Sequence, residues 1–465
     1  MNRAILTAFF ACGTMLAGCN LAPKYVRPVG AVPAELPHDG IYPAAASDAP
    51  DVSTLGWHDF FTDPRLRQVI GSGLENNRDL RVAAANVMAA QAQYRVQRSR
   101  QFPTVSTNNA ATFTNDPTLT RDGKGEHIYS VDVGINSFEV DLFGRLKNLS
   151  KAALEEYFAS DEGQRATRIS LIAEIATQWL TLASDLDQLE ISKKTMESFA
   201  KSRELTQAQF RIGTQSELNA RQADAQYQAA RNDVAVLETQ IAQDRNALDL
   251  LVGGPIPPAL LPATLPEDAT LSQLPAGISS EVLLRRPDVL QAEHRLIAQN
   301  ADIGAARAAL FPTISLTGIL GAISSPLGGL FSGSSFYRTL EPSASYNIFD
   351  AGRARANVRV AEADKQAAVA TYEKTIQTAF REVADALAER GTIDEQLSAQ
   401  RSGAESAEVA ARLSFAQYEV GVGSFLNYLD SQRTAYSSQQ ALVTTRLNRA
   451  TNLVRLYSSL GGGLS

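Results

Sequence analysis

The pattern of apolar and polar positions predicts two very long helices, one in each half of the chain. Residues 145–210 contain no proline and only one interior glycine, Gly163, and are rich in the strong helix formers Ala, Leu, Gln, Glu and Arg. Residues 353–419 are predicted to form a second helix of similar length. At ~1.5 Å per residue, each helix is expected to be a rod of about 100 Å.

The apolar residues of the first long helix form more than one stripe. Steps of four and three, as in a heptad repeat, connect Ile172, Ala176, Trp179, Ala183 and Leu186. Other apolar residues in the same region fall off this stripe, namely Ile169, Ala173, Ile175, Leu180 and Leu182. The pattern predicts packing on two sides, as in a curved wall of helices. An ordinary antiparallel coiled coil is the alternative.

Four shorter helices are predicted to stack in pairs into two further rods. Their expected bounds are 63–100, 216–251, 279–310 and 425–459. The segment 252–278 contains the run Pro255-Ile256-Pro257-Pro258, which cannot be helical because proline lacks the amide proton and clashes with the preceding turn. We expect this excursion to form part of an equatorial belt around the rods.

Strands are predicted after each Phe-Pro pair, where the preceding helix has to end. In residues 129–136, Tyr129, Val131, Val133 and Ile135 alternate with polar or small residues, which indicates one apolar and one polar face. Residues 314–320 show a weaker alternation, and the stretches 116–125 and 324–335 are typical of loops. A half-buried sheet of a soluble protein would give the same alternation, so this signal alone is weak.

An internal repeat organises these elements. Phe102-Pro103-Thr104 returns as Phe311-Pro312-Thr313, and the run from Ala208 to Gly213 is matched from Ala416 to Gly421. Ser137-Phe138 similarly returns as Ser345-Tyr346, so three separate matches share an offset of about 208. The chain is therefore interpreted as a tandem duplication, with repeats at 63–251 and 279–460 and a flexible tail at 461–465. The fold class is mainly α with a small β part.

The N-terminus has the features of an export signal. A short positive start is followed by an apolar run and by Leu16-Ala17-Gly18-Cys19, which is typical of a bacterial lipoprotein. Residues 1–18 are then a signal peptide, Cys19 carries a covalent lipid, and 19–62 is a lipid-anchored extended segment. The other cysteine, Cys12, leaves with the signal, so no disulfide is expected. An ordinary signal peptide with a chance cysteine is the alternative.

Charge and motif content disfavour several classes of function. The net charge is -7 without any basic block, so nucleic acid is an unexpected partner. No two of the four histidines lie at metal-ligand spacing, and no nucleophile, zinc or phosphate-loop motif of an enzyme is present. No enzyme activity, metal or cofactor is expected, apart from the lipid on Cys19.

Together these residues give the chain a family resemblance. The lipoprotein signal, the duplicated Phe-Pro-Thr strand entry, the helix opening Leu284-Arg285-Arg286-Pro287-Asp288 and the run from Leu429 to Arg433 resemble the outer-membrane factor family. Within that family the chain is similar to TolC-like efflux channel lipoproteins of the OprM and NodT type. The order and spacing of the motifs, from Leu16 to Gly463, make the resemblance specific.

The resemblance implies a homotrimer with a β-barrel in the outer membrane and a long α-helical barrel in the periplasm. The sequence is compatible with this, because no apolar run of 18 or more residues follows the signal and a spanning sheet has to be closed. Four strands are too few to close, whereas two copies give eight strands and three give twelve. The family implies three copies and a trimeric 12-stranded transmembrane barrel.

The resemblance also implies functional residues near the helical tips, in the turns 211–216 and 419–424. Its motif positions place a gate at Leu426, Asp430 and Arg433, and threefold symmetry would make each a ring of three. Spacing of four puts Leu426 and Asp430 on one helix face. An ordinary exposed pair between Asp430 and Arg433 is the alternative.

The tip turns are implied to dock the periplasmic adaptor protein of a pump. The residues expected to take part are Gly213, Thr214, Gly421 and Val422. They read equally well as plain helix–loop–helix turns.

The predicted function is that of a passive, gated outer-membrane duct in a tripartite efflux pump. The expected partners are the adaptor and an inner-membrane RND-type transporter driven by protons. Alternatives are a type I protein secretion duct and a non-conducting structural lipoprotein that spans the periplasm. Only four methionines occur, and Met1 and Met15 belong to the signal, so drugs or other small solutes are expected cargo rather than copper or silver.

Overall fold

The computed structural model describes residues 20–43, 55–114, 126–267, 269–271 and 279–463. The predicted signal peptide and Cys19 lie outside the described residues. The chain divides into two compact units, Met1–Val29 with Asn86–Asp161 and Gln291–Glu373, and Gly30–Ala85 with Glu162–Leu290 and Lys374–Ser465. Each unit therefore contains segments from both repeats.

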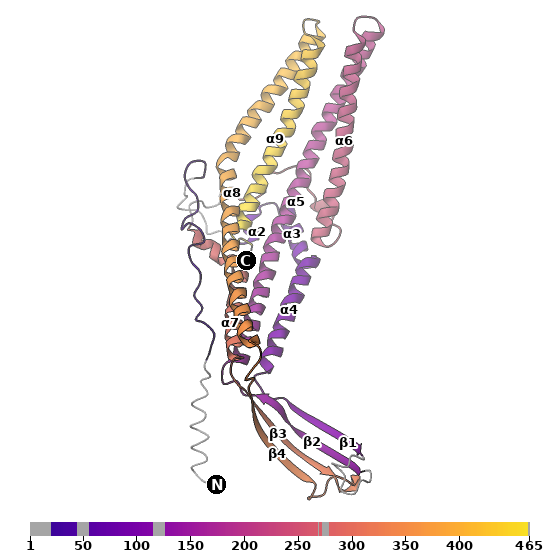
Figure 1. Cartoon of the computed structure of the whole chain (residues 1–465). Coiled ribbons are helices and arrows are strands. Elements are labelled where there is room, and N and C mark those ends of the chain that lie inside the picture. Colours follow the sequence, from indigo (N-terminus) through magenta and orange to yellow (C-terminus); the bar gives the residue numbers. More distant parts are fainter. Residues whose placement is uncertain (1–19, 44–54, 115–125, 268, 272–278, 464–465) are drawn as a thin grey trace. The chain divides into compact units, whose positions relative to one another are not determined.

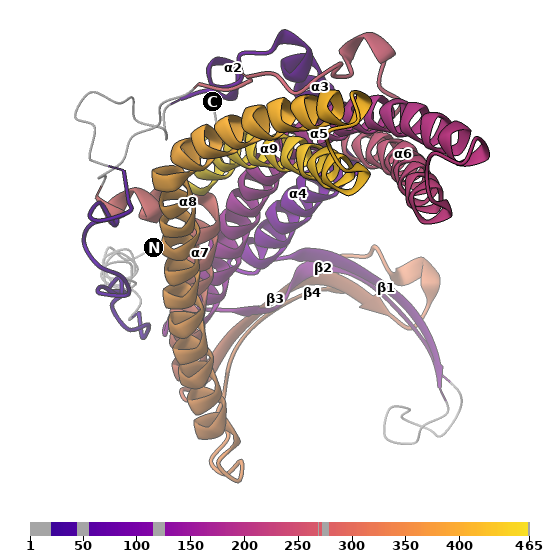
Figure 2. The same cartoon turned by 90° about the horizontal axis from the view of Figure 1, so that it is seen from above.

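A four-stranded antiparallel sheet lies in the first unit (Figure 1). Its strands, in the order β1-β2-β3-β4, are Val105–Thr114, Glu126–Glu139, Thr313–Ser324 and Phe336–Ser345. The sheet is strongly curved (Figure 2). The predicted alternating segments 129–136 and 314–320 lie within β2 and β3. Because β2 pairs with β3, the backbone hydrogen bonds of one sheet join the two repeats.

The register of the strands separates the sheet into two faces. Directly opposed residues of paired strands lie on the same face, so Val133 shares a face with its partner Leu320. This face, with Tyr129, Val131 and Ile135, is called the apolar face. Asp132 lies on the opposite, polar face, where it accepts a hydrogen bond from Asn108 at 3.2 Å. The alternation predicted for β2 is thus present in three dimensions.

β2 contains one irregularity, between Ile135 and Phe138, where two residues have no separate partners on β3. Ser137 has a positive φ of 50°, and its amide donates to Thr317 Oγ1 at 3.2 Å. A non-glycine residue rarely adopts this conformation, and a bulge is one place where it is accommodated. The paired residues on either side, Ile135 with Gly318 and Phe138 with Leu316, keep their side chains in phase.

The helices agree closely with the predicted ranges. The two long helices are α5, Arg145–Arg211, and α8, Arg353–Glu419. They are followed by α6, Glu217–Val252, and α9, Phe425–Ser459. Each of these bounds lies within one residue of its prediction, because glycine-containing turns end the long helices and a serine caps each following one. The fold class, mainly α with a small sheet, is confirmed.

The predicted helix 63–100 is wrong at one point, because it is broken into α3, Pro64–Asn76, and α4, Arg78–Ser99. Asn77 lies between them in an extended conformation, with ψ 135°. Its side-chain amide donates to Leu251 O at 2.8 Å, and its side-chain oxygen accepts from Leu80 N at 2.8 Å. The side chain therefore caps α4 while it binds the end of α6.

The predicted helix 279–310 also starts differently. Residues Ser280–Arg285 form a 3₁₀ turn, and the α-helix α7 runs only from Pro287 to Ala308. Arg286 is extended, with ψ 137°, because a residue before proline is disfavoured in the α conformation. Three further short elements complete the described chain: α2, Trp57–Phe60, and 3₁₀ turns at Pro258–Leu260 and Leu327–Gly329.

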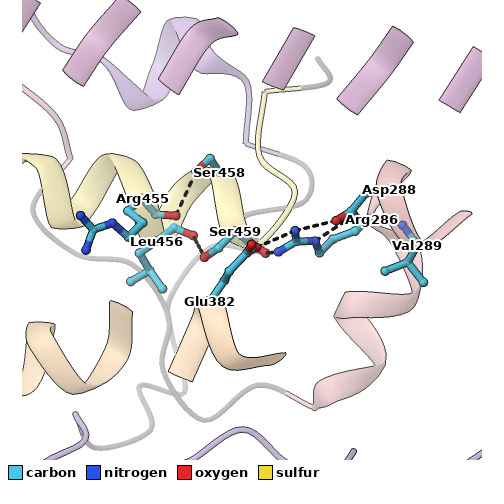
Figure 3. Close-up of polar contacts among 8 residues, drawn as sticks. All are labelled: Arg286, Asp288, Val289, Glu382, Arg455, Leu456, Ser458 and Ser459. Atoms are coloured by element: carbon cyan, nitrogen blue, oxygen red, sulfur yellow. Dashed lines mark hydrogen bonds and ion pairs between the residues drawn. The ribbon is translucent and has the colours of Figure 1, made fainter. Parts of the chain in front are cut away.

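Arg286 joins three elements of the second unit (Figure 3). Its guanidinium is largely buried and donates to Asp288, to Glu382 Oε2 at 2.8 Å and to Ser459 O at 2.6 Å. The start of α7, the middle of α8 and the end of α9 thereby meet at one cation. Since every partner is an oxygen and two are carboxylates, the buried charge is compensated.

The core of the second unit surrounds α5 on two sides. Trp179 has no exposed surface, and its indole NH donates to Leu260 O at 3.0 Å in the proline-rich excursion. Residues of the predicted stripe and of the second apolar side are both buried: Ile172, Ile175, Ala176, Leu180, Leu182 and Ala183. Packing on two sides is confirmed.

The predicted flexible tail differs at its start. Gly461, Gly462 and Gly463 are buried, and a Cβ on Gly462 would lie 2.3 Å from the ring of Tyr457. The Tyr457 ring stacks on Phe60 with 4.0 Å between centroids, and its hydroxyl donates to Leu55 O at 2.7 Å. At position 462 only glycine fits, because the Tyr457 ring lies where a side chain would be. Residues 464–465 lie outside the described residues.

No helix of the described segments has both the length and the apolar character needed to cross a membrane.

Two carboxyl groups meet between α5 and α6. Asp244 is buried, and its Oδ1 accepts from the side-chain amides of Gln178 at 3.1 Å and Gln240 at 3.0 Å. Its Oδ2 has no donor unless the neighbouring Asp185 carboxyl is protonated. Burial, together with the hydrogen bond and the charge of Asp244, raises the pKa of Asp185 to about 7. The pair therefore shares one proton at acidic pH.

This pair predicts a pH-dependent stability. Because the folded-state pKa of Asp185 lies above its unfolded value, its stabilising contribution is complete below about pH 4 and is lost as the pH rises through 7. Asp185→Asn supplies a permanent amide donor, so the change in Tm between pH 5 and pH 8 should be smaller in this variant than in the parent. Differential scanning calorimetry at both pH values checks this. Equal slopes for the two proteins would contradict a shared proton.

Candidate functional site at the helical tips

The two turns between the long helices and their successors have the same backbone structure. Gly213 and Gly421 both adopt φ 79°, a left-handed conformation in which only glycine is unstrained. The amide of Thr214 donates to Gln209 O at 3.0 Å, and that of Val422 donates to Gln417 O at 3.0 Å. These bonds satisfy the last carbonyl groups of α5 and α8. All four predicted docking residues therefore lie in matching places.

The following helices begin with the same cap. Ser216 Oγ accepts from Asn219 N at 3.2 Å, and Ser424 Oγ accepts from Asn427 N at 3.1 Å. A serine in this position satisfies one of the free amides at a helix start. The two tips thus share their local structure as well as their sequence motifs.

The side chains around the turns are unusually apolar for an exposed region. Ile212 and Val420, at equivalent positions, are 75% and 73% exposed, and Val422 is 80% exposed. Leu218 and Leu426, which are also equivalent, are 65% and 62% exposed. Together these five residues are called the tip rim. A group of large exposed apolar side chains of this kind is typical of an interaction surface.

An aromatic cluster lies next to the second turn. Tyr418, Phe425 and Tyr428 are buried there, with Ala223 of α6 and Leu429 beside them. The rings of Tyr418 and Tyr428 stack with 5.7 Å between centroids. These aromatic residues were not predicted as functional from the sequence. The comparison of the two repeats contains a signal for them. All three positions are aromatic in the second repeat, whereas only one of the equivalent positions in the first repeat is aromatic: Phe210, Glu217 and Ala220.

Tyrosine hydroxyl groups connect the second hairpin with the first. Tyr418 OH donates to Gln209 Oε1 at 2.7 Å. Tyr428 OH lies 2.5 Å from Ser202 Oγ on α5, and burial raises the pKa of this tyrosine. Further along α9, Tyr436 OH lies 2.8 Å from Ser192 Oγ on α5 and donates to Asp233 Oδ2 on α6 at 3.1 Å. These contacts hold α9 against both helices of the other hairpin.

The predicted gate residues lie on α9 away from this cluster. Leu426, Asp430 and Arg433 are all exposed, whereas Tyr428 and Leu429 between them are buried. Within the described chain, Asp430 and Arg433 form no ion pair and no hydrogen bond. The structure therefore does not show the Asp430–Arg433 ion pair that was the alternative to a gate. The Asp430 carboxylate and the Arg433 guanidinium are available to bind another molecule. Their role as a gate stays a prediction.

No group of three or more His, Cys, Asp or Glu side chains that could hold a metal ion occurs among the described residues. The tips expose the apolar tip rim, the Asp430 carboxylate and the Arg433 guanidinium.

A sequence model of one family, described as outer membrane efflux protein, matches the chain twice, at residues 69–254 and 278–462. The bounds of the two matches lie within six residues of those of the two predicted repeats, 63–251 and 279–460. The solvent efflux pump outer membrane protein SrpC of Pseudomonas putida is 42% identical over 456 residues, which are 97% of each chain. The cation efflux system protein CusC of Escherichia coli O157:H7 is 38% identical over 98% of each chain.

Solved structures show the same similarity. The open state of the MtrE outer membrane channel of Neisseria gonorrhoeae has a TM-score of 0.85 and 37% sequence identity, and the alignment covers 96% of this chain and 99% of that one. The outer-membrane channel OprN has a TM-score of 0.87 at 31% identity and 100% coverage of its chain.

The left-handed glycine of the second turn predicts a clear effect of a methyl group. Gly421→Ala should lower stability by about 1 kcal/mol because alanine is strained at φ 79°. The control is Gly403→Ala within α8, where a Cβ meets no atom within 4 Å and helix propensity improves. Thermal unfolding should therefore show Tm falling in the first variant and rising in the second. A fall in both would contradict the role of φ at the turn.

Proposed function

The chain belongs to the outer membrane efflux protein family, and we propose that it is the passive, gated outer-membrane duct of a tripartite efflux pump for small organic solutes. The observation that carries the proposal is the match of the family model to both repeats, together with relatives that are 42% identical over nearly the whole length. The family consists of efflux proteins rather than enzymes. The duct therefore needs no catalytic residues.

The proposed assembly is a homotrimer. Within the described chain, β1 pairs only with β2 and β4 pairs only with β3, so each outer strand presents a row of free backbone groups. The pairing of β2 with β3 joins the first repeat to the second. In the duplication β4 is equivalent to β2, and β1 is equivalent to β3. By the same pairing, β4 of one copy would therefore join β1 of the next copy. Three copies then form a closed twelve-stranded sheet in the outer membrane.

The proposed gate follows from the exposed face of α9. In a threefold assembly Leu426 forms an apolar ring, and Asp430 forms a ring of three carboxylates. Neither Asp430 nor Arg433 is bound within the described part of its own chain, so both are available to a neighbouring copy or to ions. A ring of carboxylates attracts cations and repels anions.

The proposed partner at the tips is the periplasmic adaptor protein of the pump. The tip rim supports this, because Ile212, Val420 and Val422 are more than 70% exposed at the ends of two hairpins. Gly213, Thr214, Gly421 and Val422 would shape or contact the docking surface. The adaptor in turn would connect the duct with an inner-membrane RND-type transporter, whose proton gradient supplies the energy.

The proposed cargo is small and organic. Relatives are named as components of solvent, toluene, antibiotic and cation efflux systems, which indicates that ducts of closely similar sequence serve different pumps. The chain has only four methionines, two of them in the predicted signal, so only two thioether ligands of the kind that suits copper(I) remain outside it. We therefore place cargo selection in the partners rather than in this chain.

Lipid attachment at Cys19 is part of the proposal. The segment that follows this cysteine is firmly held in the first unit, which suits a short tether. Asn300 Nδ2 donates to Pro23 O at 2.7 Å. Arg27 forms a two-pronged ion pair with the buried Glu293, at 2.7 and 2.6 Å, and Tyr25 OH donates to the same carboxylate at 3.0 Å. These contacts hold residues 23–27 against α7, a few positions after the proposed lipid attachment site.

The gate predicts a change in conductance. In planar bilayers, the parent protein should give small or flickering currents with a preference for cations. Asp430→Ala combined with Arg433→Ala should give steady currents that are several-fold larger, and the shift in reversal potential due to the carboxylate ring should be reduced.

The matched control is Glu217→Ala with Arg221→Ala, an exposed acid and base on α6 beside the other turn. It should leave the currents as in the parent. Equal increases in both double variants would place the constriction elsewhere. No current from any of the three, despite confirmed insertion, would contradict a duct.

Lipid attachment has a direct test in cells. Cys19→Ser should lose all incorporation of radiolabelled palmitate and leave the precursor uncut at the lipoprotein site. Cys12→Ser is the control, because Cys12 lies within the predicted signal and should not affect labelling. Label retained on the Cys19 variant would refute the lipoprotein assignment.

A further inference from the structure

The apolar face of the sheet contains one unexpected cation. Arg338 on β4 opposes Leu320 on β3, which in turn opposes Val133 on β2. The strand neighbours on the same side of Arg338 are Phe336 and Leu340, which are 63% and 74% exposed. The guanidinium therefore lies in the middle of large exposed apolar side chains.

The acids of the sheet whose side chains the structure describes lie on the other side. By the alternation of the strands, Asp132, Glu139 and Glu341 belong to the polar face. Arg338 itself is exposed and makes no hydrogen bond or ion pair within the described chain. Since an arginine retains its charge and no described residue of the chain pairs with Arg338, its guanidinium is open to a counterion from another molecule.

A second copy cannot supply that counterion from the neighbouring strand. β4 is an outer strand, and the strand proposed to pair with it is β1 of the next copy. The side chains of β1 on the apolar face are Val105, Thr107, Asn109, Ala111 and Phe113. None is acidic, so the β1 side chains on this face supply no carboxylate to Arg338.

The position of Arg338 suits the boundary between lipid chains and headgroups. β4 begins at Phe336, directly after the loop that connects it with β3, and this loop exposes Phe331 to 86% and Leu327 to 61%. Arginine can cover apolar surface with its methylene stem while its charged end extends several ångströms towards a polar layer. Aromatic residues next to such a boundary are typical of membrane proteins.

We propose that Arg338 binds the phosphate group of a membrane lipid whose acyl chains lie against Phe336, Leu320 and Leu340. The proposal rests on the outer-membrane function above, because it requires the apolar face to meet lipid. A guanidinium can hold a phosphate through two parallel hydrogen bonds, which a lysine cannot reproduce. The site thus selects a lipid by its phosphate and holds it by its chains.

The test compares two lipids that differ only in phosphate. Purified protein in neutral detergent is titrated with diphosphorylated lipid A and with the same lipid after phosphatase treatment, and bound lipid is counted by native mass spectrometry. The parent protein should bind the phosphorylated lipid about tenfold more tightly than the other. Arg338→Gln should bind both lipids equally, and Arg338→Lys should retain only part of the preference.

The control is Arg359→Gln, which removes an exposed arginine of α8 and should leave the tenfold preference intact. A parent without any preference, or an Arg338→Gln variant that keeps it, would overturn the proposal. A thermal shift by inorganic phosphate alone that disappears in Arg338→Gln would assign the site to a free anion instead of a lipid.

Conductance of the same preparations separates this inference from the proposed function. Normal currents from a protein without phosphate preference would overturn the lipid site and leave the duct intact. Absence of both currents and lipid binding, with the protein folded, would refute the outer-membrane function on which the site rests.

Discussion

The pairing of β2 with β3 is the constraint on which the rest of this molecule depends. It is made by backbone hydrogen bonds between residues nearly 200 positions apart, and it fixes the first repeat against the second before any helix packing is considered. Once the two repeats are joined in this way, β1 and β4 are left as the outer strands of the sheet, with free backbone groups. The proposed threefold assembly uses the same kind of join again, between β4 of one copy and β1 of the next.

The features of the fold that could be predicted from the sequence are those determined by residues close together along the chain. The ends of α5 and α8 were predictable because Gly213 and Gly421 provide a left-handed residue and a capping serine follows each of them. The two faces of β2 were predictable because alternation has a period of two. The break at Asn77 was not, because its cause is a hydrogen bond to Leu251, more than 170 positions away.

The same distinction holds for the candidate site. The turns were recognised from their repeated motifs, whereas the tyrosine contacts were missed because each has a partner on another helix, such as Ser202 for Tyr428. Buried polar groups of this kind have no periodic signature. They also specify one arrangement of packed helices more strictly than apolar contacts do, since each one left unpaired costs free energy.

The bulge at Ser137 has a consequence for the history of the chain. Phe102 and Phe311 are 209 positions apart, but Ser137 and Ser345 are 208 apart, so one residue was gained or lost between the two halves. A bulge is a place where a paired strand accommodates one extra residue, and at Ser137 it does so while Phe138 keeps its phase. Any alignment of the two halves should therefore carry a gap of one residue between Phe102 and Ser137. Divergence after the duplication changed the length of one half in this interval and kept the pairing of the two apolar strand segments on either side of the bulge.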